Sequence, residues 1–220
     1  MTAPPAPRSS AEIRQYLIGR LNHALRRPEM FGGEVALRLL LDHLAYVDKR
    51  EASWAAEWRV MEGHGTHNAL GVTGAFQAVM PGDCGHGVAS AYAEFVRACG
   101  WLEVTEVLSA DEYAAMDERL DDWAVQDHTL SEVVDTFGAP SVLFGGSSPL
   151  YGKTLGYVAM QSANPMIFFH LWNGTDPGDP SSRRPVYSEP LLLAIRRGSV
   201  PFCEAFTFTP EGCRRRPETG

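Results

Sequence analysis

Long apolar runs are missing from this sequence, and basic residues are in short supply. The most apolar helical stretch, residues 35–47, is interrupted by Arg38, Asp42 and His43, which makes it too polar to span a bilayer. Of the 220 residues, 27 are Asp or Glu and 19 are Lys or Arg, so the net charge is −8. A protein that binds nucleic acid usually needs a basic surface to displace counterions from phosphates. The composition therefore argues against a membrane span and against a direct nucleic-acid partner.

Cysteines are few, and the first residues lack the features of a secretory signal. The chain has four cysteines, and its opening MTAPPAPRSS has neither an apolar run nor a cleavage pattern. Because a chain of this length can bury a core without covalent cross-links, disulfides are not required. We therefore expect a soluble cytoplasmic protein whose thiols are reduced.

Residues 9–137 carry the signals of α-helices. Capping boxes, in which a Ser or Thr is followed three residues later by Glu, begin at Ser9, Ser109 and Thr129, and apolar residues recur at helical intervals behind them. The segment RPEMFGG, residues 27–33, predicts a tight turn between two antiparallel helices, because proline and glycine favour such geometry. The eight residues before Ser9 include three prolines and no periodicity, which predicts a disordered extension over residues 1–8.

From residue 138 onward the sequence becomes typical of β-strands. Short runs rich in Val, Ile, Phe and Tyr alternate with turn residues, and these runs are SVLFGG, TLGYVAMQ, MIFFHLW, LLLAIRR and FCEAFTFT. The spacing leaves no room for crossover helices, so the sheet should be antiparallel. We predict one composite α+β domain, in which a mostly helical layer, residues 9–137, packs on one face of an antiparallel β-sheet, residues 138–212. Residues 213–220 are predicted to be a flexible tail, and residues 173–184 a long loop that is either a solvated connector or a carrier of binding residues.

The densest set of metal-ligating side chains lies in one glycine-rich stretch. It contains His64, His67, Cys84 and His86, whose nitrogen and sulfur atoms suit zinc, and the first two are spaced like neighbours on a helical turn. The stretch lacks the paired CxxC or HxxxH spacing of structural zinc sites, and its glycines are equally typical of loops with ordinary polar histidines. A Cys84 nucleophile would need a base within hydrogen-bond reach. A zinc site, a metal-free enzyme or small-molecule site, and ordinary loop or core positions all stay open.

Acidic residues are concentrated in residues 103–135. This segment has eleven acidic residues and a single basic one. Asp117 and Asp121 are four residues apart on a predicted helix, and so are Glu118 and Asp122, which places like charges next to each other. Such pairs cost a few tenths of a kcal/mol each, which favours a docking surface for a basic partner. A solvated helix face is the alternative interpretation.

These patterns favour a protein that acts by binding another protein. We expect the contact surface to include Asp117, Glu118, Asp121, Asp122 and Trp123, and the partner to be basic. Size, charge and the lack of a catalytic motif are typical of an immunity or antitoxin-type protein that neutralises a basic toxin. The alternative is an enzyme or small-molecule binder that uses the four His and Cys residues, with or without zinc. A homo-oligomer with a tryptophan-lined patch is a third hypothesis.

Overall fold

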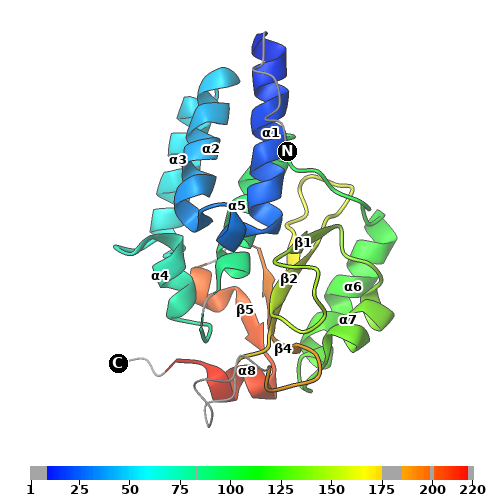
Figure 1. Ribbon diagram of the computed structural model, residues 1–220. Coiled ribbons are helices and arrows are strands. Elements are labelled where there is room, and N and C mark those ends of the chain that lie inside the picture. The colour runs from blue at the N-terminus through cyan, green and yellow to red at the C-terminus, as the bar shows by residue number, and fades with distance from the viewer. Residues whose placement is uncertain (1–8, 83, 175–184, 199–200, 218–220) are drawn as a thin grey trace.

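An N-terminal helical region precedes a C-terminal sheet along the chain (Figure 1). The computed structural model describes residues 9–82, 84–174, 185–198 and 201–217, so the predicted extension 1–8 and most of the predicted loop 173–184 lie outside the described residues. The elements before the sheet are α1 (Ser10–Arg26), η1 (Pro28–Met30), α2 (Gly33–Val47), α3 (Glu51–Gly63), α4 (Gly71–Gln77), α5 (Gly85–Ala98), α6 (Ala110–Trp123) and α7 (Leu130–Phe137). The elements that follow are β1 (Val142–Phe144), β2 (Lys153–Tyr157), β3 (Ile167–Trp172), β4 (Leu191–Arg197), η2 (Phe202–Glu204), β5 (Phe206–Phe208) and α8 (Pro210–Arg215).

The five-stranded sheet is an antiparallel meander, so the predicted α+β class is confirmed. Its strand order follows the chain from β1 to β5, and each pair of neighbours is antiparallel. The register between β3 and β4 shifts after His170, because Leu193 has no partner opposite it. The Leu193 carbonyl accepts a hydrogen bond of 3.0 Å from the amide of Thr209. The irregularity therefore positions the start of α8 against the sheet.

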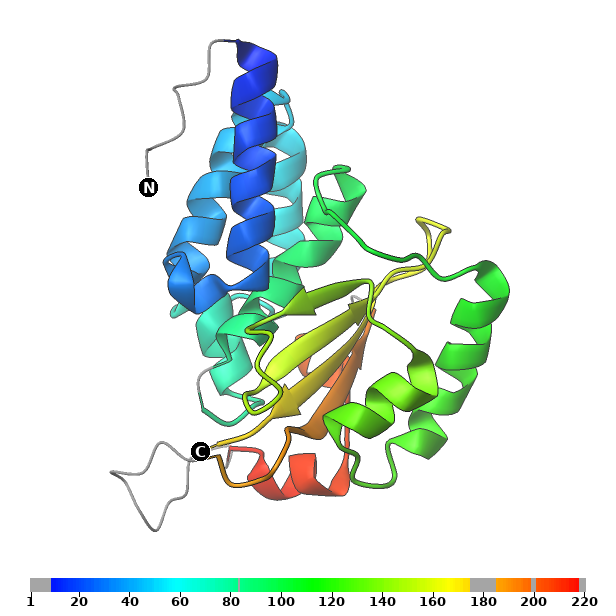
Figure 2. The same ribbon diagram turned by 45° about the vertical axis from the view of Figure 1, so that its right-hand side comes forward.

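Helices cover both faces of the sheet, whereas the sequence led us to expect one covered face. The helices α1 to α5 contribute to the core on one face, and α6 and α7 cover the other (Figure 2). In β3, Phe168 and His170 point to the first face, and Ile167, Phe169 and Leu171 point to α6 and α7. The sequence of a strand that is buried on both faces is apolar at nearly every position. The segment IFFHLW is such a sequence, and it is the signal for the second helical layer.

The local helix signals are confirmed. The capping boxes at Ser109 and Thr129 are both formed, and the Ser9 hydroxyl accepts a hydrogen bond from the amide three residues later. At the predicted turn, Gly32 and Gly33 have φ angles of 96° and 62°. Residues that carry a side chain rarely adopt this left-handed backbone conformation. Glycine at these two positions therefore allows the chain to reverse and α2 to pack along α1.

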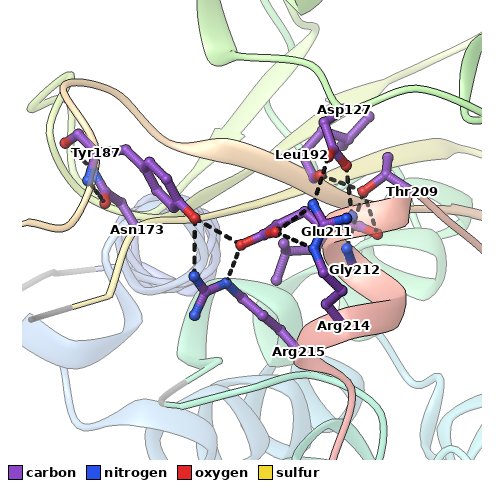
Figure 3. Close-up of polar contacts among 10 residues, drawn as sticks. Asp127, Asn173, Tyr187, Leu192, Thr209, Glu211, Gly212, Arg214 and Arg215 are labelled. Carbon is purple, nitrogen blue, oxygen red and sulfur yellow. Dashed lines mark hydrogen bonds and ion pairs between the residues drawn. The ribbon is translucent and has the colours of Figure 1, made fainter. Parts of the chain in front are cut away.

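Helix α8 is anchored by a buried carboxylate, that of Glu211 (Figure 3). The Tyr187 hydroxyl donates to it at 2.7 Å, and Arg214 and Arg215 form ion pairs with it. Arg214 also pairs with Asp127, in the connection between α6 and α7, at 2.7 Å. Burial raises the pKa of Glu211, but the hydrogen bonds from Tyr187 and the two arginines outweigh it and lower the pKa to about 2. The segment predicted as a flexible tail therefore begins as the last turn of a helix.

Two glycine substitutions are expected to change stability in opposite directions. In Gly212→Ala, the new Cβ would overlap the backbone carbonyl of Leu193, so α8 or β4 has to shift. We expect this change to lower the free energy of unfolding by about 2 kcal/mol or more. Gly19 lies inside α1 with nothing within 4 Å of the position of a Cβ, so Gly19→Ala should raise stability by about 0.5–1 kcal/mol. Urea unfolding measures both, and a Gly212→Ala protein as stable as the wild type would contradict the close approach of α8 to β4.

Candidate functional site

The acidic helix α6 has a buried side and a charged side. Met116 and Leu120 are buried against the sheet. On the opposite side, Asp111, Glu118 and Asp122 are exposed, and their spacing of seven and four residues places them in one line. None of these three carboxylates forms a hydrogen bond or ion pair with a residue that the structure describes. We call this set the acidic stripe.

The other two predicted contact acids on α6 have a partner within the fold. Arg197 of β4 contacts Asp117 at 3.3 Å and also pairs with Asp121. Because one guanidinium pairs with both carboxylates, it offsets the electrostatic repulsion between Asp117 and Asp121, which are four residues apart. Of the four predicted acids, Asp117 and Asp121 are thus engaged inside the molecule, and Glu118 and Asp122 point outward.

Trp123, which we predicted to contact a partner, lies half-buried between α6 and α7. Its indole stacks on the imidazole of His128, with ring centroids 3.6 Å apart and an interplanar angle of 2°. It also meets the ring of Phe137 edge-on, at 4.8 Å. Arg119, the one basic residue of the acidic segment, lies 5.5 Å from the centroid of the Phe137 ring. Trp123 therefore holds the two helices together, and only its exposed part is open to a partner.

Two acidic residues elsewhere in the fold, Asp48 and Glu103, are paired with arginines. Asp48 accepts two hydrogen bonds from Arg14, at 2.6 and 2.9 Å, and one from the indole of Trp101 at 2.8 Å. The hydrogen bond from Arg14 is the main reason that the pKa of Asp48 is lowered. Glu103, at the start of the acidic segment, pairs with Arg26 at 3.2 Å. The acidic stripe differs from these carboxylates because its charges are not compensated by the residues described.

The structure does not bring His64, His67, Cys84 and His86 together. His64 is the C-cap residue that follows α3, and the ring of His67 packs against Trp58 with centroids 4.2 Å apart. Cys84 is buried just before α5, and His86 is buried within that helix. Within the described ranges, no group of three or more His, Cys, Asp or Glu side chains is arranged to hold a metal ion. The zinc hypothesis therefore has no support from these residues.

His86 instead belongs to a buried polar chain that sequence reasoning missed. Its Nδ1 lies 2.9 Å from Oγ1 of Thr154, which lies 3.0 Å from Nδ1 of His170. A hydroxyl has one hydrogen, so Thr154 donates to one imidazole and accepts from the other. Burial lowers the pKa of His86 to about 4 and lowers the pKa of His170 well below its usual value. Two neutral imidazoles thus link α5 to the sheet.

A second cluster that the sequence did not reveal lines a cavity of about 40 Å³ between α3, α5 and the end of β4. Its ionisable members are Glu57, His64, Glu94 and Arg196. Burial, followed by the charge of Glu94, raises the pKa of Glu57. Burial lowers the pKa of Arg196 to about 10, so its guanidinium stays charged at neutral pH. Because these residues come from three separate elements, no spacing in the sequence groups them.

Comparison of the chain with protein-family models, curated proteins and solved structures finds no match. None of the helices in the described ranges combines the length and the apolarity that crossing a membrane requires.

Proposed function

We propose that this protein acts by binding a basic protein through the acidic stripe, in the manner of an immunity or antitoxin-type protein. The observation that supports this proposal is the line formed by Asp111, Glu118 and Asp122, whose carboxylates are exposed and form no ion pair with a described residue. Like charges four residues apart destabilise a helix by a few tenths of a kcal/mol. An external cation would remove that cost, and a surface of one sign also steers a partner of the opposite sign.

The ion pairs on the flank of α6 suggest how the partner is held. Arg197 binds Asp117 and Asp121, which are four residues apart. Glu118 and Asp122 have the same spacing one position further along the helix, and they face outward. A partner's arginine would therefore find in them the pair of acceptors that Arg197 finds inside the molecule.

The proposal places this interaction in the cytoplasm. Cys99, Cys203 and Cys213 are free thiols. Free thiols are typical of proteins in reducing compartments. The cytoplasmic setting is thus part of the proposal, together with a small basic toxin as the partner.

Charge reversal of the outward pair is the direct test. We expect Glu118→Lys/Asp122→Lys to weaken binding of a short oligo-arginine peptide by about tenfold at low salt, because each exposed ion pair contributes up to about 1 kcal/mol. The same variant should lose binding to a basic protein encoded next to this chain. Fluorescence anisotropy measures the first effect and co-purification the second. Wild-type binding should itself weaken as salt is raised from about 20 to about 200 mM.

A matched variant controls for net charge. Glu51→Lys/Glu204→Lys introduces the same change at two exposed acids outside the acidic segment. It should bind the peptide like the wild type, apart from a small nonspecific loss. If both double variants lose affinity equally, the effect belongs to total charge and the acidic stripe is not the binding surface. Full affinity of Glu118→Lys/Asp122→Lys would contradict the proposal outright.

A further inference from the structure

The cavity between α3 and α5 has the composition of a ligand site, and it is separate from the acidic stripe. It is lined by Glu57 and His64 of the α3 region, Glu94 of α5 and Arg196 of β4, with apolar walls that include Phe202. Its volume of about 40 Å³ has room for about three water molecules, or for one small polar head group. An open hollow of about 790 Å³ shares the lining residues Glu94 and Gly198 with this cavity. A ligand could thus place its head group inside and the rest of its atoms in the hollow.

Arg196 is the unusual member of this cluster, because its charge is buried without a paired carboxylate. Its exposed fraction is 5%, and its guanidinium lies 4.2 Å from the centroid of the Phe168 ring. One terminal nitrogen donates to the carbonyl and the hydroxyl of Ser90, at 3.1 and 3.2 Å. Its Nε has no hydrogen-bond partner in the described part of the chain. A buried charge in this state is costly unless a further acceptor reaches it.

The two carboxylates that line the cavity come from different helices, Glu57 from α3 and Glu94 from α5. Glu94 accepts a hydrogen bond of 2.9 Å from the amide of Met166, which fixes its position. Neither Glu94 nor Glu57 comes within ion-pair distance of Arg196 among the described residues. Burial and the charge of Glu94 both raise the pKa of Glu57, and the charge of His64 opposes them without outweighing them. The cavity is therefore lined by one guanidinium and two carboxylates, and within the described residues no ion pair joins them.

We propose that this cavity binds a small zwitterion, an α-amino acid, whose carboxylate pairs with Arg196 and whose ammonium group lies between Glu57 and Glu94. A simple anion would be repelled by the two glutamates, and a simple cation would be repelled by the guanidinium. A ligand that carries both charges on adjacent carbon atoms satisfies both sides at once. Its side chain would extend into the open hollow, whose walls include Met160, Pro165 and Val107.

Ligands that differ by one charged group test this proposal without any mutation. Isothermal titration of the wild-type protein with each of the common L-amino acids should reveal saturable binding by at least one of them at a Kd of about 1 mM or tighter. For an alanine-binding site, propionate lacks the ammonium group and ethylamine lacks the carboxylate, and neither should bind at about 10 mM. If no amino acid binds up to about 10 mM, the proposal is wrong. If propionate binds as tightly as the amino acid, the cavity is a simple anion site, and the proposal is also overturned.

Substitutions assign the binding to this cavity. Glu57→Gln keeps the shape of the side chain and removes one acceptor charge, so the affinity for the amino acid should fall at least about tenfold. Glu51→Gln, on an exposed part of the same helix, should leave the affinity unchanged. Arg196→Lys should weaken binding as well, because an ammonium group cannot reproduce the guanidinium geometry. Unchanged binding by Glu57→Gln would place the ligand elsewhere and overturn the proposal. None of these measurements depends on the acidic stripe.

Discussion

Acidification from pH 7 to pH 5 is expected to lower the free energy of unfolding by about 2 kcal/mol through His86 alone. The imidazole of His86 is buried, hydrogen-bonded to Thr154, and held neutral with a pKa of about 4. In the unfolded chain the same group binds a proton at about pH 6.5. His170, at the other end of the chain of hydrogen bonds, has its pKa lowered as well and adds to the loss.

The direction of this effect follows from proton uptake by the unfolded state. Between the unfolded pKa of about 6.5 and the folded pKa of about 4, unfolded molecules bind protons that folded molecules do not. Stability is therefore full above about pH 7, falls as the pH decreases through 6 and 5, and has lost about 3 kcal/mol from His86 by pH 4. Carboxylates whose pKa is lowered by the fold, such as Glu34 and Glu211, stabilise the folded state while they are ionised. This contribution is lost only at lower pH, where they become protonated. Between pH 7 and pH 5 the loss of stability therefore comes from the histidines, and Glu57, whose pKa is raised, acts in the opposite direction.

Urea unfolding at several pH values measures the effect. His86→Gln keeps a group that can hydrogen-bond to Thr154 but does not titrate, so its stability should depend less on pH between 7 and 5. His43→Gln, at an exposed position of α2, is the matched control and should show the wild-type slope. If the slope in His86→Gln equals that of the wild type, then His86 is not kept neutral by the fold.

Removal of the Glu34 carboxylate is expected to be among the most destabilising single changes on the helical side. Glu34, on the first turn of α2, accepts hydrogen bonds of 2.8 Å from the amides of Val72 and Thr73 and of 2.7 Å from the Thr73 hydroxyl. The Tyr92 hydroxyl of α5 donates to it at 2.8 Å. One carboxylate therefore joins α2, α4 and α5. Leu70, the residue at the N-cap of α4, offers no side-chain cap, so Glu34 provides it from another helix.

We expect Glu34→Ala to lower the free energy of unfolding by about 3 kcal/mol or more, because hydrogen bonds to a charged group contribute about 1.5–3 kcal/mol and several donors lose their acceptor. Glu34→Gln retains one acceptor oxygen and should lose less. Denaturant unfolding measures both variants. Glu51→Ala, which removes an exposed acid from the first turn of α3, should cost only a few tenths of a kcal/mol. A loss below about 1 kcal/mol in Glu34→Ala would show that α4 does not depend on this cap.

The candidate sites could be read from the sequence only in part. The concentration of acids in residues 103–135 was visible, because it is a property of composition. The sequence did not show which of these acids are paired inside the molecule. Asp117 and Asp121 pair with Arg197, which lies about eighty residues later in the chain. Likewise, four His and Cys residues close in sequence are separated in space, since α5 buries His86 against Thr154 of β2. Proximity along the chain proved a poor guide to proximity in the fold.

The sequence by itself determined the elements of this protein, and the tertiary structure determined what those elements hold together. Helix caps, turns and strand runs depend on interactions within a few residues, so the capping boxes at Ser109 and Thr129 and the antiparallel sheet were predictable. The second helical layer, the cap supplied by Glu34 and the cavity around Arg196 depend on contacts between distant segments. Such contacts form only when the helices and the sheet pack, because burial rather than local preference brings these side chains together.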